Sequence, residues 1–179
     1  MTTPRTPRPL DPARLEDLAL AYVARFATTA AKLAAYCRRK VRERGWEGER
    51  EPEFEALVAR LAAAGYVDDA GFARARAAGL ERRGYGARRI DEALRGAGIA
   101  QPLREAVRGD AGAARRAALV MARKRRFGPF GAEPPHPARR EKQIAALLRA
   151  GHALDTAREL VDAASEAAAL EWVEEAVGD

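Results

Sequence analysis

The sequence is poor in the residue types on which many catalytic and metal sites depend, with one cysteine, two histidines and one serine. Cys37 has no partner for an internal disulfide, and we expect it in a hydrophobic core because it continues a helical apolar stripe that begins at Leu33. His136 and His152 are not near Cys, Asp or Glu at metal-ligand spacing, so we expect both in solvent or in loops. Ser165 has no histidine near it in an alanine-rich stretch, which argues against a nucleophilic triad. The sequence therefore predicts no enzyme, no metal and no cofactor.

Long apolar runs are also missing. No stretch approaches the roughly twenty apolar residues of a membrane span. The segment 2–9 is basic and rich in proline, without the apolar stretch of a signal peptide. We therefore expect a soluble cytoplasmic protein, monomeric and without a membrane partner.

Aromatic residues make up 6% of the chain, and its apolar content is carried mainly by alanine and leucine. Alanine, leucine and arginine are strong helix formers, and no useful length of strand-like alternation is present. The composition and periodicity predict an all-α fold. A length of 179 residues permits either one domain or two small ones.

One helical pattern occurs twice, at an offset of fifty-seven residues. Each copy has an arginine, a small residue four places on, and then a basic and an apolar residue that open an amphipathic helix. The copies are Arg25, Thr29, Lys32, Leu33 and Cys37, then Arg82, Gly86, Arg89, Ile90 and Leu94. Such repetition is typical of stacked arrays that present extended surfaces. It favours a protein that binds a partner over one that transforms a substrate.

The helical stripes and turn signals divide the chain into a tail and three repeats of three helices. We expect a disordered basic tail at 1–14 and helical repeats at 15–65, 66–108 and 109–179, the last with an acidic C-terminal extension. Seven apolar residues should be buried in these repeats: Leu33, Leu57, Leu61, Ile90, Leu94, Ile144 and Leu148.

Two short motifs resemble functional sites but have structural explanations. Gly84–Tyr85–Gly86 begins like a dinucleotide fingerprint, yet Arg89 replaces the third glycine and no strand precedes it, so we interpret it as a helix–helix turn. Asp68 and Asp69 could be a carboxylate pair, but one of them is expected to cap the following helix.

Charge is distributed unevenly. The net charge is +6, which indicates a polyanionic partner such as nucleic acid or an acidic protein surface; a GC-rich genome is the alternative source of so much arginine. Residues 109–149 hold ten Arg and Lys against three Asp and Glu, whereas residues 150–179 hold one against eight. On the helix expected from Pro137, Arg139, Lys142 and Arg149 share one face.

A dense basic run, Arg123–Arg126, ends the preceding helix. The helix dipole would account for one or two of these cations, so we favour contact with phosphates or an acidic surface. Few aromatic residues accompany the third repeat, and a stacking platform for bases is weakly indicated there.

The stretch Gly65-Tyr66-Val67-Asp68-Asp69-Ala70-Gly71-Phe72-Ala73 resembles the signature of the RecX family, bacterial regulators of the RecA recombinase. Its continuation from Arg82 to Ile90, then Leu94 and Gly98-Ile99, is similar to the rest of that motif at the same spacing. The chain departs from the family pattern at Lys32, which replaces an acidic residue. It departs again at Ala150-Gly151-His152, which replaces Arg-Gly-Phe.

The resemblance implies three tandem three-helix repeats in an elongated, curved molecule. It also implies an inhibitory regulator that binds the RecA filament on single-stranded DNA and limits its growth in recombination, DNA repair and the SOS response. A protein that acts by occupying DNA directly is the alternative. The cations that we single out for contact with the filament or DNA are Arg82, Arg83, Arg88, Arg89, Lys124, Arg125, Arg126, Arg139, Lys142 and Arg149.

Overall fold

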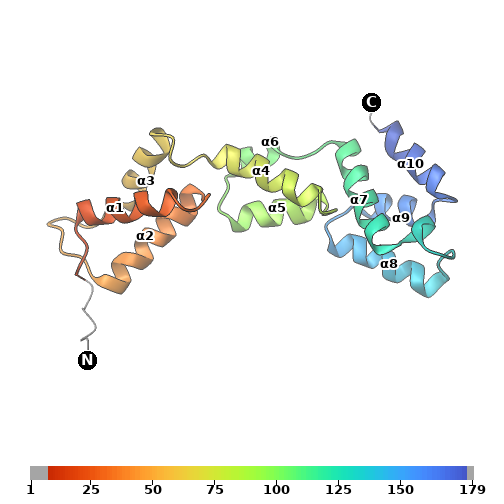
Figure 1. The fold of residues 1–179 in the computed structure, drawn as a ribbon, viewed down its shortest axis with the longest axis horizontal. Helices are drawn as coiled ribbons and strands as arrows, with labels where there is room; N and C mark the ends of the chain where they lie inside the picture. The colour runs from red at the N-terminus through yellow and green to blue at the C-terminus, as the bar shows by residue number, and fades with distance from the viewer. Residues whose placement is uncertain (1–7, 177–179) are drawn as a thin grey trace. The chain divides into compact units, whose positions relative to one another are not determined.

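A computed structural model describes residues 8–176 of the chain. Apart from one isolated bridge between Leu10 and Trp46, all regular structure in this range is helical, as predicted. The α-helices, labelled in Figure 1, are α1 (Pro12–Val23), α2 (Ala30–Arg44), α3 (Phe54–Ala63), α4 (Asp69–Glu81), α5 (Ala87–Gly96), α6 (Gln101–Ala106), α7 (Ala111–Arg125), α8 (Pro137–Arg149), α9 (Leu154–Asp162) and α10 (Glu166–Glu175). A 3₁₀ turn, η1 (Gly128–Phe130), follows α7.

The chain forms two compact units. Unit 1 comprises residues 1–72 and 97–99, and unit 2 comprises residues 73–96 and 100–179. The boundary passes through α4, so the second expected repeat, 66–108, contributes to both units. The repeat boundaries themselves remain a prediction.

Unit 1 is built on α1, α2 and α3, with α2 packed against the other two. Leu33, Leu57 and Leu61 are buried in its core, as predicted, and Cys37 is fully buried beside them. Burial raises the pKa of the Cys37 thiol, which keeps it protonated and suits a core residue.

The start of unit 1 differs from the expected disordered tail. The Leu10 side chain is fully buried, and its backbone bonds to Gly45 and Glu47 hold the chain beside Trp46. α1 then begins at Pro12, where the Asp11 carboxylate accepts a hydrogen bond from the Arg14 amide. Residues 8–14 are therefore part of the fold because Leu10 has core surface to bury; residues 1–7 of the expected tail lie outside the described range.

The N-terminus of α2 is capped by two residues from different parts of unit 1. The Thr29 hydroxyl accepts from the Lys32 amide at 3.2 Å and donates to the Ala97 carbonyl at 2.6 Å. The Asp69 carboxylate accepts from the Ala30 amide at 2.8 Å. Of the two aspartates expected to cap α4, Asp68 does so through the Gly71 amide, whereas Asp69 caps α2.

Unit 2 has a second core, in which α9 packs on α7 and α8, and α10 packs on α7. Ile90, Leu94 and Ile144 are buried as predicted. The expectation for Leu148 is wrong, because Leu147 occupies the fully buried position on α8 and Leu148 is half-buried beside it. Both residues lie within one turn of Ile144, and spacing alone did not decide which one faces the core.

Candidate anion-binding cleft

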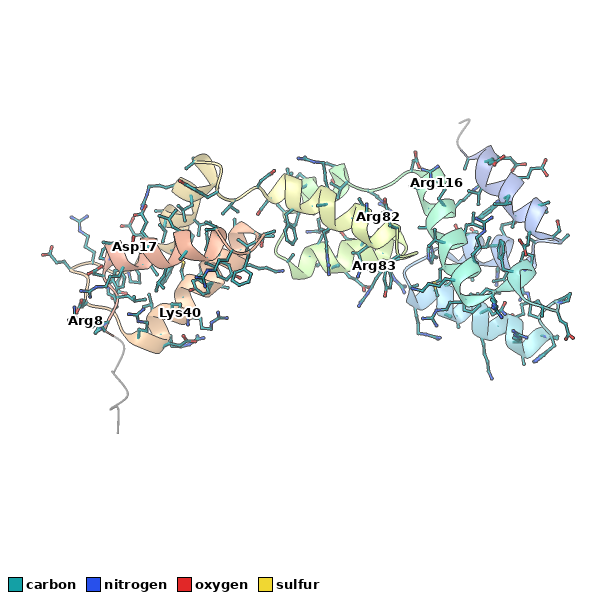
Figure 2. The ribbon with its side chains drawn as sticks, in the orientation of Figure 1. Arg8, Asp17, Lys40, Arg82, Arg83 and Arg116 are labelled. Atoms are coloured by element: carbon teal, nitrogen blue, oxygen red, sulfur yellow. The ribbon has the colours of Figure 1, made fainter. Side chains whose placement is uncertain are left out.

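Four of the ten cations singled out from the sequence meet around a cleft in unit 2. Its volume is about 270 Å³, and it is formed by the turn after α4, the C-terminal part of α7 and the end of α8. The lining residues are Arg83, Gly84, Tyr85, Met121, Lys124, Arg125, Ala146, Arg149 and Ala150. Figure 2 labels Arg83 where α4 ends.

The walls of the cleft are held together by a close backbone approach that only glycine allows. A Cβ atom on Gly86 would lie 2.4 Å from the carbonyl of Gly151, and one on Gly151 would lie 2.4 Å from the Arg89 amide nitrogen. The Gly86 amide donates to the Ala150 carbonyl at 2.9 Å, and the Arg88 amide donates to the Gly151 carbonyl at 3.2 Å. The Gly84–Tyr85–Gly86 turn is thus a helix–helix turn, as expected, and it docks on the turn between α8 and α9.

His152 reinforces this contact: it lies in the loop between α8 and α9, one of the two places expected for it, but it is buried and not in solvent. Its side chain is buried, and its Nε2 atom lies 2.9 Å from the Gly84 carbonyl oxygen. Because a carbonyl oxygen only accepts, Nε2 carries the proton and donates to it. Nδ1 is buried without a hydrogen-bond partner. Burial lowers the pKa of His152, and the bond to Gly84 opposes this shift. His136 is exposed and caps α8.

The cations around the cleft are not neutralised by acids. Within residues 8–176, no carboxylate lies within 4.0 Å of a charged nitrogen of Arg83, Lys124, Arg125 or Arg149. Arg83 donates instead to the Gly79 carbonyl at 3.0 Å, and its guanidinium lies 5.8 Å from the centre of the Tyr85 ring. The site therefore combines four exposed positive charges with an aromatic ring.

The other six cations singled out from the sequence are exposed but do not line this cleft. Arg88 and Arg89 both lie near Glu92, at 3.9 and 3.3 Å, and Arg88 also donates to the Leu148 carbonyl. Arg139 and Lys142 lie further along α8, as the sequence predicted, and Arg126 ends α7 in a left-handed conformation. Arg82 follows α4 directly beside Arg83 (Figure 2).

A larger cavity of about 480 Å³ in unit 2 is less suited to an anion. Arg104 donates to Asp91 at 2.8 Å there, and Arg95 also pairs with Asp91. The hydrogen bond from Arg104, and to a lesser extent the contact with Arg95, lower the pKa of Asp91 and keep its carboxylate charged. The carboxylates of Glu81, Asp91 and Glu105 line this cavity, whereas none of the described carboxylates lines the cleft.

Residues 154–175 of the acidic segment fold onto the basic part of unit 2 as α9 and α10. Asp162 of α9 forms two hydrogen bonds of 2.5 Å with Arg140 of α8, and this contact lowers the pKa of Asp162. Arg115 of α7 stacks on Trp172 of α10, its guanidinium 4.5 Å from the ring centre. Asp162 thus pairs with a cation that lies outside the cleft.

Sequence reasoning missed two features of the charged surface. Tyr85 was treated as part of a turn, because nothing local showed that this turn meets α7 and α8. The second is α2, which carries six cations and one acid and so has a stronger charge bias than the helix from Pro137. The spacing of Lys32, Tyr36 and Lys40 at four-residue intervals was the sequence signal that could have identified the charged face of α2.

Comparison with known proteins adds the family. No protein-family model matches the chain. The chain is 34% identical over 170 residues to a curated protein named Regulatory protein RecX from Myxococcus xanthus (strain DK1622), covering 89% of this chain and 90% of that protein. The chain belongs to the RecX family. The family resemblance seen in the sequence is therefore confirmed over 89% of the chain, and Gly84 and Tyr85 line the cleft.

Two further findings bear on the function of this RecX family member. Within residues 8–176, no group of three or more His, Cys, Asp or Glu side chains is placed to hold a metal ion. None of the helices in that range is long and apolar enough to cross a membrane.

Proposed function

We propose that the protein regulates RecA by binding the RecA filament on single-stranded DNA and limiting its growth and activities, and that it does so without catalysis of its own. The cleft is the observation that supports specific contact residues for this binding. Four cations line it with no carboxylate paired to them among the described residues: Arg83, Lys124, Arg125 and Arg149. Four uncompensated cations repel one another, so an anionic partner stabilises this arrangement.

Membership of the RecX family supports RecA as the partner, and the charge of the cleft supports an acidic surface or phosphate as what it contacts. A filament cap needs few molecules, so the protein should lower the DNA-dependent ATPase and strand exchange of RecA at sub-stoichiometric amounts. The measurement is the ATPase rate of preformed filaments as the protein is titrated in. A RecA that keeps its full rate with excess protein would contradict the proposed function.

The contribution of the cleft is tested by Lys124→Glu/Arg149→Glu, with Arg139→Glu/Lys142→Glu as the matched control. Both variants replace two exposed cations of the third repeat by two acids, but only the first pair lines the cleft. Each exposed ion pair contributes up to about 1 kcal/mol, so the first variant should lose about tenfold in filament affinity. The control should lose clearly less once folding is confirmed by circular dichroism.

Equal losses in both variants would show that total charge, and not the cleft, determines binding. Arg82→Glu/Arg89→Glu tests the alternative patch of the second repeat. The competing function, direct occupation of DNA, predicts that affinity for bare single-stranded DNA matches affinity for the filament and falls steeply with salt.

A further inference from the structure

Three aromatic side chains of unit 1 lie together between α1 and α2. The rings of Tyr22 and Tyr36 form a stack, with centroids 4.2 Å apart and an interplanar angle of 20°. Phe26 lies at the Tyr22 end of this stack, with its ring tilted by 45° and its centroid 5.2 Å from that of Tyr22. The backbone amide of Phe26 donates to the Tyr22 carbonyl at 3.0 Å, so the backbone of Phe26 is held at the end of α1.

The outer end of this stack is open. The two tyrosines are half-buried against the core of unit 1, but Phe26 is 56% exposed. Exposing a phenyl ring to water costs hydrophobic free energy, and a single exposed ring would need no explanation. Here, however, the exposed ring lies at the end of a stacked tyrosine pair in a chain with few aromatic residues.

Cations of α2 lie against Tyr36 of the stack. Lys32, Tyr36 and Lys40 lie four residues apart on α2 and hence on one face of the helix. The Arg39 guanidinium and the Lys40 ammonium lie 5.4 and 5.8 Å from the centre of the Tyr36 ring. Among the described residues, Glu43 is the carboxylate paired with this group, at 2.7 Å from Lys40 and 3.6 Å from Arg39. One acid does not balance three cations, and Figure 2 labels Lys40 on this helix.

We propose that this surface, defined by Tyr22, Phe26, Tyr36, Lys32, Arg39 and Lys40 and called here the stacking surface, binds single-stranded nucleic acid directly. An unpaired base stacks on the open face of Phe26, and the neighbouring phosphates lie against the cations of α2. Aromatic stacking combined with a cationic surface is the chemistry by which proteins hold single strands without reading sequence. A base in a duplex has both faces covered by its neighbours, so the surface should prefer single strands.

A protein partner is less well matched to the same surface. The cavity of unit 1, about 620 Å³, lies instead around Trp46 and is lined by Glu16, Glu47, Glu49, Glu51 and Glu53 among others. Those carboxylates would repel phosphates, whereas the stacking surface has a flat exposed ring, excess positive charge and no share in that cavity. The charge of the two surfaces therefore favours nucleic-acid binding at α2 over binding at the acidic cavity.

The test measures fluorescence anisotropy of a labelled oligothymidine of about 16 nucleotides, without RecA. Phe26→Ala should lower the affinity about tenfold, because base–aromatic stacking is lost. Tyr66→Ala is the matched control, since Tyr66 is also an aromatic residue of unit 1 that is 56% exposed but lies outside the stack. The control should bind like the unaltered protein.

Two further variants separate stacking from general apolar contact. Phe26→Trp should keep the affinity and should show additional tryptophan fluorescence that is quenched by the oligonucleotide. Phe26→Leu keeps an apolar side chain but not the ring and should bind as weakly as Phe26→Ala. The proposal is overturned if Phe26→Ala or Phe26→Leu binds as the unaltered protein does, or if a duplex of the same length binds equally well. Because RecA is absent, this result does not depend on the filament contact of the cleft, and either proposal can fail alone.

Discussion

His152 is a buried titratable residue at the contact that holds the cleft together. Its neutral form donates through Nε2 to the Gly84 carbonyl and leaves Nδ1 buried without a partner. A second proton would have to reside on Nδ1, where no acceptor is available to it. The folded protein therefore binds this proton less readily than the unfolded chain does, and the pKa of His152 lies below its ordinary value of 6.5.

This difference predicts the sign of a pH effect on stability. Above pH 6.5 His152 is neutral in both states and contributes no pH dependence. As the pH falls through 6.5 the unfolded chain takes up a proton that the folded protein refuses, so the free energy of unfolding decreases until the folded pKa is reached. Urea unfolding between pH 8 and pH 5 should show the loss. His152→Phe should flatten this slope, and His136→Phe, at the exposed second histidine, should not; identical slopes in all three proteins would contradict the assignment.

The cations of the cleft could be singled out from the sequence, but the residues that the fold brings next to them could not. Lys124, Arg125 and Arg149 were singled out because runs and helical spacing of like charge are visible in the sequence. That Arg83 and Tyr85 lie beside them depends on a contact between residues more than sixty positions apart, Gly86 with Ala150 and Gly151. No local pattern contains such a contact. The burial of His152 was missed for the same reason.

At the scale of helices and turns, the contact between the α4–α5 turn and the α8–α9 turn determines the geometry of the cleft. Gly86→Ala would place a Cβ atom within about 2.5 Å of the backbone of Gly151 and His152, and backbone cannot yield as a flexible side chain does. We expect the free energy of unfolding to fall by about 3 kcal/mol, which is at the upper end of the usual cost of overpacking a protein interior. Urea denaturation monitored by circular dichroism would measure it.

Gly96→Ala is the control for that substitution. Gly96 ends α5, and a Cβ atom there would meet nothing within 4 Å. Alanine in a helix is more stable than glycine by roughly 0.5–1 kcal/mol, so this variant should gain stability. If Gly86→Ala is as stable as Gly96→Ala, the two turns do not pack as closely as described.

The helices were predictable from sequence because amphipathic spacing and caps are local signals. Thr29 caps the start of α2 and Gly45 follows its end, and threonine before a helix and glycine after it are signals of this local kind. The errors occurred where a distant element decides the outcome: Leu10 is buried by the loop at Trp46, and Leu147 replaces Leu148 in the core. Of the two candidate caps of α4, Asp68 is the one that caps it, whereas Asp69 accepts from the Ala30 amide of α2.

At the scale of the whole molecule, positive charge is in excess but is distributed unequally. The net charge is +6, and helices α9 and α10 of the acidic segment pack onto α7 and α8, where Asp162 pairs with Arg140. A field of this sign attracts a polyanion over distances of about one Debye length, roughly 10 Å at 0.1 M salt. Attraction at that range depends on total charge, whereas the lifetime of a complex depends on contacts.

This distinction predicts different kinetic behaviour for the two double variants of the third repeat. Lys124→Glu/Arg149→Glu and Arg139→Glu/Lys142→Glu change the net charge by the same amount, so both should slow association with the RecA filament to a similar extent and weaken its salt dependence. Only the first pair lines the cleft, so only that variant should dissociate faster. Stopped-flow association and dissociation rates at several salt concentrations would measure both effects. If the cleft variant associates slowly but dissociates at the unaltered rate, the cleft contributes to the attraction and is not a contact in the bound state.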